Sequence, residues 1–391
     1  MAAQQLGILW PAGSFSGWGV YGLQILYELL RKGDIAPLPF HNLDAVAPPP
    51  LLADLVESVR GNHRAVAQTL ATHPEAAVTF RFPILHALGN KLVPSALAAR
   101  VHGSPDYGLV FLEDTAIDEA TRTRGRRFQR LVAGSTWNAQ VLAAAGFNDV
   151  LVSIQGIDPT IFHPAPRTGL LGNRFVVFSG GKFEYRKGQD LVVAAFRRFR
   201  QRHPEALLAA AWFNPWPELV ATMAASPWIE GLPAVEGKVV HLSQWLIANG
   251  LPRESFVVLN GVPNALMGQV MREADVALFP NRCEGGTNLV AMECLAAGIP
   301  TILSANTGHL DLIAAAPCLT LERQGPVGAK ECGTQGWGES DLDEMVEALE
   351  SAYQQREAVQ ATGMRAAQVM RERFTWSTRI DAMLRALSLR D

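Results

Sequence analysis

The residues best suited to chemistry in this chain of 391 residues lie in one stretch, 282–300. It reads Arg-Cys-Glu-Gly-Gly-Thr-Asn-Leu-Val-Ala-Met-Glu-Cys-Leu-Ala-Ala-Gly-Ile-Pro. The apolar run before it, 276–280, predicts a buried strand, and apolar residues at helical spacing from Leu289 onward predict a helix. Gly285 and Gly286 permit a tight turn between the two and a close approach of a ligand to the backbone. The stretch therefore predicts a strand, a ligand-binding turn and a helix.

Two carboxylates flank this turn. Thr287 or Asn288 can cap the helix, so that its first amides are left to bind an anion. Glu284 precedes the turn, and Glu293 lies about two helical turns further on, which places one carboxylate at each end of a potential phosphate site. An ordinary strand-turn-helix unit with a solvated Glu293 explains the same features, and the local pattern does not decide between the two interpretations.

A second glycine loop carries positive charge. The apolar run 175–179 predicts a strand, and Gly180 and Gly181 follow it together with Lys182 and Lys187. Each lysine can place an ammonium group on a diphosphate, while the glycines allow the phosphates to approach the backbone. Two solvated loop lysines are the alternative.

A similar turn occurs near the start of the chain. The run 6–10 predicts the first buried strand, and the glycine-rich segment 11–19 leads into a helix that Gly33 ends. Gly17 and Gly19 could bring the backbone close to a ligand, although a tight turn without a ligand fits the same pattern.

Further polar residues are expected at strand ends in the first half. His86 is predicted at the carboxyl end of a strand, where ligands of parallel sheets collect, but a structural histidine is a common alternative and His102 is an equal rival. Glu113 and Asp114 are predicted to end the strand that begins at Tyr107. They could orient an acceptor hydroxyl or cap the next helix.

Composition is that of a soluble globular protein, with 48% hydrophobic and 18% charged residues. The formal net charge of -3 gives no electrostatic reason to bind nucleic acid. The basic cluster 122–127 has two interpretations, a solvated face or a contact for phosphate or anionic lipid. The four cysteines show no metal-binding spacing and suit a reducing cytoplasm. We expect no signal peptide and no transmembrane segment. The expected location is the cytoplasm, and peripheral contact with the inner membrane face is an open alternative.

The elements that position these residues alternate between strand and helix through the whole chain, which predicts an α/β fold. We expect an N-terminal Rossmann-like domain over residues 1–165 and a second over 172–373, with the proline- and glycine-containing stretch between them as the linker. The segment 214–250, rich in tryptophan and proline, has no predicted function. Its tryptophans and Trp212 could stack on a sugar, but core packing or a lid is the more common use.

The central stretch resembles the nucleotide-sugar signature of retaining glycosyltransferases with the GT-B fold, in particular family four. In that family a Glu-x7-Glu pattern is followed by Ala-x-Gly-x-Pro. Glu293, Gly298 and Pro300 match it, whereas the interval from Glu284 is one residue longer, and we take Glu284 as the equivalent glutamate.

Other segments resemble the same family. Lys187 matches the lysine of its Gly-Arg…Lys-Gly motif, and Lys182 stands where arginine is usual, so it would bind phosphate as a point charge and not as a fork. The motifs Ser-x-Trp-Asn at 135–138 and Gly-Ile-Asp-x-x-x-Phe-x-Pro at 156–164 also resemble the family.

The resemblance implies two doubly wound Rossmann-like domains facing an interdomain cleft, with the last helix, 374–391, crossing back to the first domain. It implies transfer of a sugar, a hexose in type, from a UDP- or GDP-linked donor to an acceptor hydroxyl, with retention, without a metal ion and without a cofactor. The acceptor is a glycan, a lipid-linked compound or a small molecule. The predicted catalytic residues are Glu284, Lys187, Lys182 and His86. The predicted nucleotide-sugar ligands are Gly17, Gly19, Gly180, Gly181, Lys182, Lys187, Asn260, Glu284, Gly285, Gly286, Thr287, Asn288, Leu289 and Glu293.

Two alternatives stay open. One is another enzyme of the same fold, a sugar-nucleotide epimerase or a phosphorylase; a pyridoxal-binding lysine or dependence on inorganic phosphate would indicate the phosphorylase. The other is a non-catalytic protein that binds a sugar nucleotide or acts as a scaffold. The longer interval before Glu293 and the presence of Lys182 are the features that keep this second alternative open.

Overall fold

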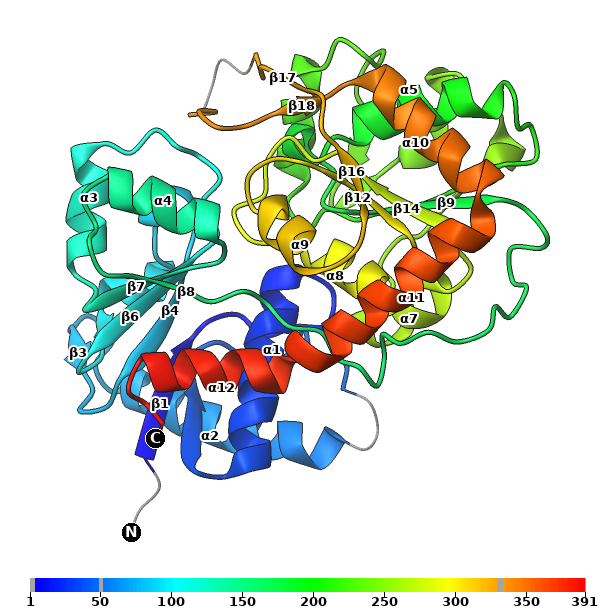
Figure 1. Ribbon diagram of the computed structural model, residues 1–391. Coiled ribbons are helices and arrows are strands. Elements are labelled where there is room, and N and C mark those ends of the chain that lie inside the picture. The colour runs from blue at the N-terminus through cyan, green and yellow to red at the C-terminus, as the bar shows by residue number, and fades with distance from the viewer. Residues whose placement is uncertain (1–3, 49–51, 329–332, 391) are drawn as a thin grey trace. The chain divides into compact units, whose positions relative to one another are not determined.

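The computed structural model describes residues 4–48, 52–328 and 333–390. The chain forms two compact units (Figure 1). Unit 1 comprises Met1–Gly156, Pro263–Ala265 and Trp376–Asp391, and unit 2 comprises Ile157–Val262 and Leu266–Thr375. The chain thus passes from unit 1 to unit 2 at residue 157, before the proline-containing stretch 164–172, and it returns to unit 1 at the last helix.

Unit 1 is built on a parallel sheet of six strands in the order β2-β1-β4-β6-β7-β8. The strand order reverses between β1 and β4, so the loops that follow these two strands diverge there. The strands are β1 (Gln4–Leu9), β2 (Ile35–Pro39), β4 (Ile84–Leu88), β6 (Asp106–Val110), β7 (Arg130–Ala133) and β8 (Val150–Val152). A separate parallel pair consists of β3 (Val78–Thr79) and β5 (Val101–His102).

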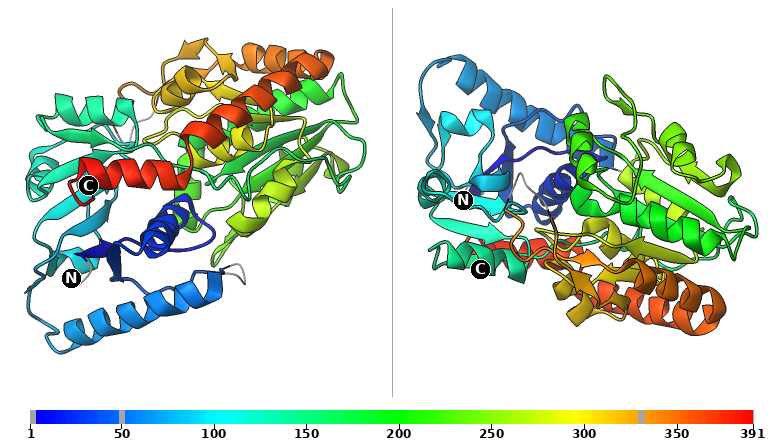
Figure 2. Two further views of the ribbon diagram at one scale, coloured as in Figure 1. Left: turned by 60° about the horizontal axis from the view of Figure 1, so that its bottom comes forward. Right: turned by 90° about the horizontal axis from the view of Figure 1, so that it is seen from above.

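The first and last helices of the chain pack together in unit 1. Ser16 caps α1 (Gly17–Lys32), and Gly33, with a φ of 72°, ends it. The Tyr21 ring of α1 lies 4.9 Å from the Trp376 ring of α12 (Trp376–Ala386), and the views in Figure 2 keep these helices side by side. The other α-helices of this unit are α2 (Ala53–Ala71), α3 (Glu119–Arg126) and α4 (Thr136–Ala144).

Unit 2 contains a second parallel sheet of six strands, in the order β13-β10-β9-β14-β15-β16. Its order reverses between β9 and β14, which makes the carboxyl ends of these two strands its switch point. The strands are β9 (Val176–Gly181), β10 (Leu207–Trp212), β13 (Phe256–Val258), β14 (Val276–Phe279), β15 (Thr301–Ser304) and β16 (Leu319–Leu321). The two sheets confirm the predicted α/β class with two doubly wound domains.

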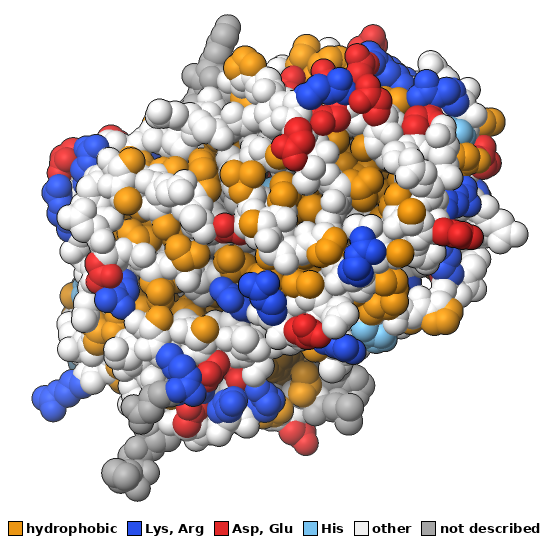
Figure 3. Space-filling view, in the orientation of Figure 1, with side chains coloured by type: hydrophobic (Ala, Val, Ile, Leu, Met, Phe, Trp, Pro, Cys, Tyr) orange, Lys and Arg blue, Asp and Glu red, His pale blue; other side chains and the backbone are white. Residues whose placement is uncertain are grey.

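Helices connect these strands and follow them. They are α5 (Gln189–Arg200), α6 (Leu242–Ala248), α7 (Asn264–Met271), α8 (Leu289–Ala296), α9 (His309–Ala315), α10 (Leu342–Gln354) and α11 (Arg356–Arg373). On the surface, the ion pair Arg198–Asp343 joins α5 to α10, and Arg202, in the turn after α5, pairs with Glu350 of α10; both pairs are 2.7 Å long. Figure 3 shows basic and acidic side chains intermixed over these helices. Exposed pairs of this kind each contribute little to stability.

The basic cluster of unit 1 is largely occupied by its own neighbours. Arg126 pairs with Glu119 at 2.8 Å, Arg124 donates to the Lys91 carbonyl at 2.8 Å, and Arg127 donates to the Ala98 carbonyl at 3.1 Å. These contacts favour the solvated-face interpretation over a dedicated phosphate site. None of the helices in the described part of the chain is long and apolar enough to cross a membrane.

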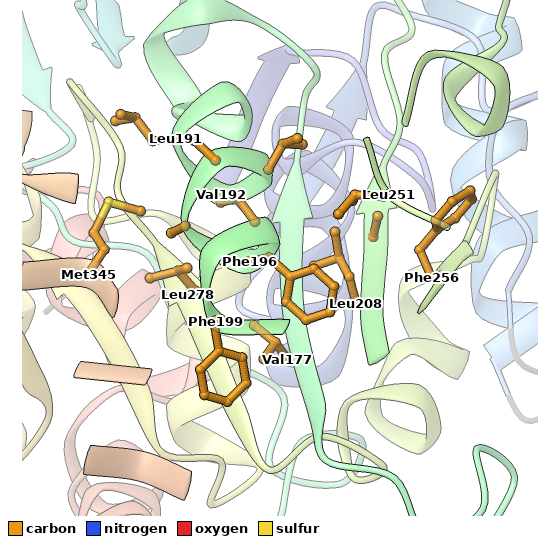
Figure 4. Packing of buried hydrophobic residues seen from close by; sticks show 14 of the residues in the cluster. Val177, Leu191, Val192, Phe196, Phe199, Leu208, Leu251, Phe256, Leu278 and Met345 are labelled. Carbon is orange, nitrogen blue, oxygen red and sulfur yellow. The ribbon is translucent and has the colours of Figure 1, made fainter. Parts of the chain in front are cut away.

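The core of unit 2 lies between α5 and its sheet (Figure 4). Phe196 and Phe199 of α5 are fully buried and lie against Val177 and Leu208 of the central strands. Burial of each such ring contributes roughly 1.5–3 kcal/mol relative to an exposed one. This packing fixes the sheet whose carboxyl edge carries the two loops that are predicted to bind the nucleotide sugar, residues 182–188 and 281–288. We call them the donor loops.

The segment 214–250 forms short elements around this core. They are the 3-10 helix η5 (Pro217–Ala225), the hairpin of β11 (Val235–Glu236) and β12 (Val239–Val240), and α6. Trp212 and Trp245 are buried in the core, as the packing interpretation expects. Trp216 differs, because 40% of the residue's surface is exposed.

Candidate functional site

Two loops meet at the switch point of unit 2. The loop after β9 passes through the 3-10 helix η4 (Tyr185–Lys187) and ends at Gly188, and the loop after β14 runs through residues 281–288. Gly188 has a φ of 70°, and a Cβ atom there would lie 2.3 Å from the Pro280 carbonyl oxygen. Only glycine therefore lets the first loop pack against the end of β14.

An ion pair joins the two loops. The Lys187 Nζ atom lies 2.5 Å from Oε1 of Glu284, and Arg186 donates to Oε2 of Glu284 at 3.1 Å. The Asn281 side-chain amide also donates to the Glu284 carboxylate. All of these side chains are buried or nearly so. The structure thus brings together two of the predicted catalytic residues, Lys187 and Glu284.

The two members of this pair shift each other's pKa values. Burial alone would raise the pKa of Glu284, but Lys187, Arg186 and His309 hold it at about 2. Burial lowers the pKa of the Lys187 ammonium, and Glu284 opposes that effect. Because the carboxylate and the ammonium lie in contact, each favours the ionised form of the other.

Lys182 belongs to the same charged cluster but does not touch Glu284. Its Nζ atom lies 3.2 Å from Oε1 of Glu184 and 5.3 Å from the centre of the Trp216 ring. Glu184 in turn accepts a hydrogen bond of 2.5 Å from Arg186. Gly180 and Gly181 precede Lys182 at the end of β9, and Gly181 has a φ of 129°. Lys182 therefore extends the positive charge of the site towards the end of β10.

Arg282 organises the second loop, and the sequence interpretation gave it no role. Its guanidinium makes two hydrogen bonds to the Asp190 carboxylate, at 2.8 and 2.7 Å, and one of 2.7 Å to Glu339. It also lies 3.8 Å from the centre of the Tyr185 ring and donates to the Tyr185 carbonyl at 2.7 Å. These contacts fix the backbone two residues before Glu284. In the sequence, only its position directly before Cys283 and Glu284 indicated a role for Arg282.

A third loop, 304–309, packs against the same turn. The Glu284 amide donates to the Thr307 hydroxyl at 2.8 Å, and the Gly308 amide donates to the Glu284 carbonyl at 3.0 Å. A Cβ atom on Gly308 would lie 1.6 Å from the Gly286 carbonyl oxygen. A side chain at 308 would therefore displace the turn of Gly285 and Gly286.

Asn288 begins α8. It has a φ of 61°, and its side-chain oxygen accepts from the Ala291 amide at 3.4 Å. Its side-chain nitrogen lies 3.1 Å from Nε2 of the buried His309. Of the two predicted caps, Asn288 holds the position, while the Thr287 hydroxyl faces the Met292 sulfur at 3.0 Å. The helix then starts at Leu289.

Glu293 is buried inside unit 2, with 3% of its surface exposed. It lies in the second turn of α8, where its charge adds to burial in raising the pKa of the Cys294 thiol. The interpretation of Glu293 as a solvated helix residue is therefore wrong. Asn260, the remaining predicted ligand in unit 2, is exposed just beyond the carboxyl end of β13.

The predicted residues of unit 1 lie in a different setting. Gly17 is the exposed first residue of α1, and the Gly19 amide donates to the Ser16 hydroxyl at 3.1 Å. His86 lies inside β4, because the strand continues to Leu88, so its predicted place at a strand end is wrong. Its fully buried ring contacts Asp106 at 2.6 Å, which favours a structural histidine over a catalytic one.

His102 and the paired acids also have structural partners. The His102 Nδ1 atom lies 3.8 Å from the Asp106 carboxylate. The Asp114 carboxylate accepts from the Ala116 amide at 2.9 Å and lies 3.7 Å from Lys91. Neither Glu113 nor Asp114 caps the next helix, because Asp118 is the N-cap of α3.

A family model matches part of this chain. Residues 256–383 match the model of a family described as "Family 4 Glycosyltransferase in conflict systems". A search of curated protein sequences finds no match.

Solved structures share the fold of the whole chain. Sucrose-phosphate synthase from Thermosynechococcus elongatus is 14% identical with a TM-score of 0.65, over 99% of this chain and 98% of that one. HepE from Anabaena in complex with UDP-glucose is 14% identical with a TM-score of 0.63, over 99% and 100%. Trehalose-6-phosphate synthase, OtsA, is 14% identical with a TM-score of 0.63, over 100% of both chains. At these identities the likeness concerns the fold, and it agrees with the GT-B architecture expected from the motifs.

Proposed function

We propose that this chain, which belongs to the family-four glycosyltransferases with the GT-B fold, transfers a hexose from a nucleoside-diphosphate sugar to an acceptor hydroxyl, with retention and without a metal ion. The observation that carries the proposal is the contact of 2.5 Å between Lys187 and Glu284 at the switch point of unit 2. It places a cation for phosphate beside a carboxylate that can accept from sugar hydroxyls.

The diphosphate would lie between the two loops. Lys187 and Lys182 would each bind a phosphate oxygen, and the amides at the start of α8 would add their partial positive charge. These groups stabilise the negative charge that develops as the diphosphate leaves. Because the protein supplies these cations, we infer that the reaction needs no metal ion.

The nucleoside would extend along the sheet edge away from β14. In that direction lie Trp216, after β10, and Asn260, after β13. The exposed Trp216 ring gives a base a face on which to stack. A UDP-linked donor is the first candidate, since the similar fold of HepE from Anabaena holds UDP-glucose.

The sugar would lie against Glu284. With its pKa held at about 2, the Glu284 carboxylate is ionised at neutral pH and accepts hydrogen bonds from sugar hydroxyls. The bond from the anomeric carbon to the diphosphate oxygen breaks, and a bond to the acceptor oxygen forms on the same face. The acceptor proton passes to the departing diphosphate, so no protein nucleophile is required. The ring passes through an oxocarbenium-like state.

Nucleotide binding tests the proposal directly. We expect UDP or GDP to raise the melting temperature of the parent protein, and to do so much less in Lys187→Ala. Ligand at roughly a hundred times its dissociation constant stabilises the native state by about 2.7 kcal/mol. Lys238→Ala is the matched control, because Lys238 is an exposed lysine of the same unit.

Turnover then separates an enzyme from a binding protein. Incubation with UDP- and GDP-linked hexoses should release the nucleoside diphosphate, as measured by chromatography and mass spectrometry. Binding of a nucleotide without any release or transfer, across a panel of sugars and acceptors, would favour the non-catalytic alternative. Failure of every nucleotide to bind would contradict the donor site itself.

A further inference from the structure

A charged cavity lies in unit 2, at the edge of the sheet opposite the donor loops. It has a volume of about 260 Å³ and lies beside the residues that precede β14 and β15. We call it the amino-edge pocket. Its lining includes Arg167, Arg272, Asp275, Arg356, Ile299 and Met364.

The pocket has an excess of positive charge. Three arginines and one carboxylate line it. Asp275 is fully engaged, because Oδ1 pairs with Arg167 at 2.7 Å and Oδ2 accepts from the Val176 amide at 2.7 Å. Among the described residues, neither Arg272 nor Arg356 has a carboxylate partner within 4.0 Å. Two cations that share a cavity without such a partner are a site for an anion from solution.

Neutral groups hold these two arginines in place. The Arg356 guanidinium lies 5.0 Å from the centre of the Phe175 ring and 4.7 Å from that of the Tyr353 ring. Arg272 lies 3.5 Å from Nε2 of His163. The rings hold the Arg356 guanidinium in place, so less rotamer entropy is lost when it binds a ligand.

We propose that the amino-edge pocket binds a small phosphate monoester, a phosphorylated sugar in type, through Arg272 and Arg356. A guanidinium pairs with phosphate through two parallel hydrogen bonds, which a neutral sugar cannot match. Pro164, Ile299 and Met364 give the pocket an apolar side against which the carbon skeleton would lie.

The pocket is connected to the donor loops through one helix. Ala297 to Pro300 form part of its wall, and they directly follow α8, whose first turn is capped by Asn288 of the donor loop. Helix α11 lies against the same end of α8, since a Cβ atom on Gly363 would lie 2.4 Å from the Gly298 carbonyl oxygen. A ligand that contacts both helices would therefore have a continuous packed path to the donor site through which the two could be coupled.

Thermal unfolding with inorganic phosphate, glucose 6-phosphate and glucose, at matched ionic strength, tests the binding site. We expect the two phosphate compounds to raise the melting temperature and glucose to leave it unchanged. Arg272→Gln and Arg356→Gln should each weaken phosphate binding roughly tenfold, as expected for loss of a charge-assisted hydrogen bond. Arg365→Gln, an exposed change on α11 outside the pocket, is the control and should behave as the parent.

The variant Lys187→Gln shows which site is filled. If the phosphate compounds stabilise this variant as they stabilise the parent, they bind outside the donor site, as proposed. Loss of the effect in Lys187→Gln, its persistence in the Arg272→Gln/Arg356→Gln double variant, or no effect in any protein would overturn the proposal.

The effector role, which rests on the proposed donor site, has a separate readout. Calorimetric titration of UDP should give a dissociation constant at least about fivefold different when glucose 6-phosphate is saturating. The same titration of the double variant should show no difference. An unchanged UDP affinity in the parent would refute the coupling, and the melting-temperature experiment still decides the binding site.

Discussion

The carboxyl edges of the two sheets carry opposite kinds of side chain. In unit 2 the edge holds Lys187 and Glu284 in contact within a buried cluster of charges. In unit 1 it holds packed aromatic rings, with Trp18 4.9 Å from Trp10 and 4.6 Å from Phe111. In each sheet the strand order reverses once, and the loops diverge at the carboxyl ends of the two strands concerned. The shared architecture thus supplies two similar places for a ligand, and the charges indicate which one suits a diphosphate.

The two edges also differ in how they hold their shape. In unit 2, ion pairs and a glycine without room for a side chain fix the loops. In unit 1, side-chain amides serve this purpose: the Asn90 oxygen accepts from the amides of Glu113 and Asp114 at 2.8 and 3.1 Å. Changes in charge should therefore disturb unit 2 far more than unit 1.

The largest effect should follow from the buried arginine of unit 2. Arg282→Gln leaves Asp190 buried without its cation, and removal of one partner of a buried ion pair costs roughly 3–5 kcal/mol. Urea unfolding should show this loss. Arg202→Gln, which breaks an exposed pair, should cost less than about 1 kcal/mol. Equal losses in the two variants would mean that the Arg282 network does not hold the loop.

Glu284→Gln should separate catalysis from binding. The change keeps the shape of the side chain but removes its charge, so hydrogen bonds to the sugar weaken as positive charge develops on it. We expect turnover to fall by roughly 10²–10³. UDP binding should be retained, because Lys187 then loses its internal anion. Glu254→Gln, at an exposed glutamate, should have parental turnover. Parental turnover in Glu284→Gln would remove this residue from the chemistry.

Mild acid should weaken unit 2 through His309. Burial lowers the pKa of this ring to about 4 from an ordinary value of 6.5. Between these pH values His309 is protonated in the unfolded chain but not in the folded chain. The free energy of unfolding therefore falls as the pH drops from 6.5 to 4. The loss is roughly 3 kcal/mol for one such group.

His309→Gln tests this origin of the acid sensitivity. Urea unfolding between pH 7 and 4 should lose less stability in this variant than in the parent. The exposed His73 of unit 1 is the comparison, and His73→Gln should keep the parental pH dependence. The same acid loss in the parent and in His309→Gln would assign the effect to other groups.

The smallest effect should come from Trp216→Leu. Stacking of a base on an aromatic ring contributes roughly 1–3 kcal/mol, so UDP should bind about tenfold or more weakly. Pyrophosphate, which has no base, should bind as it does to the parent, and Trp216→Phe should keep most of the affinity for UDP. Equal weakening for UDP and pyrophosphate would show that Trp216 acts through Lys182 and not through the base.

Local pattern was sufficient to predict the parallel α/β fold and the strand-turn-helix unit at 276–296. Buried strands and amphipathic helices are set by residues close in sequence, and the turn glycines stand beside them. Strand ends were harder to predict. The strand expected to run from Tyr107 to Asp114 ends at Val110, and the Asn90 side-chain oxygen accepts from the amides of Glu113 and Asp114 in place of a neighbouring strand.

The partners of buried charges could not be predicted from local pattern. Arg282 and Asp190 lie 92 residues apart, and Arg186 and Glu284 lie 98 apart. These pairs exist because the sheet order places β9 beside β14, and periodicity carries no information about that neighbourhood. For the same reason His86 could not be assigned to the interior of a strand beside Asp106.

The contact between Lys187 and Glu284 has a consequence for selectivity. A lysine already neutralised by its own carboxylate gains little from a lone inorganic phosphate, which would expel that carboxylate and offer it nothing in return. A sugar nucleotide compensates both partners, with phosphate for the ammonium and hydroxyls for the carboxylate. The proposed donor site would therefore discriminate against the free phosphate of a cell.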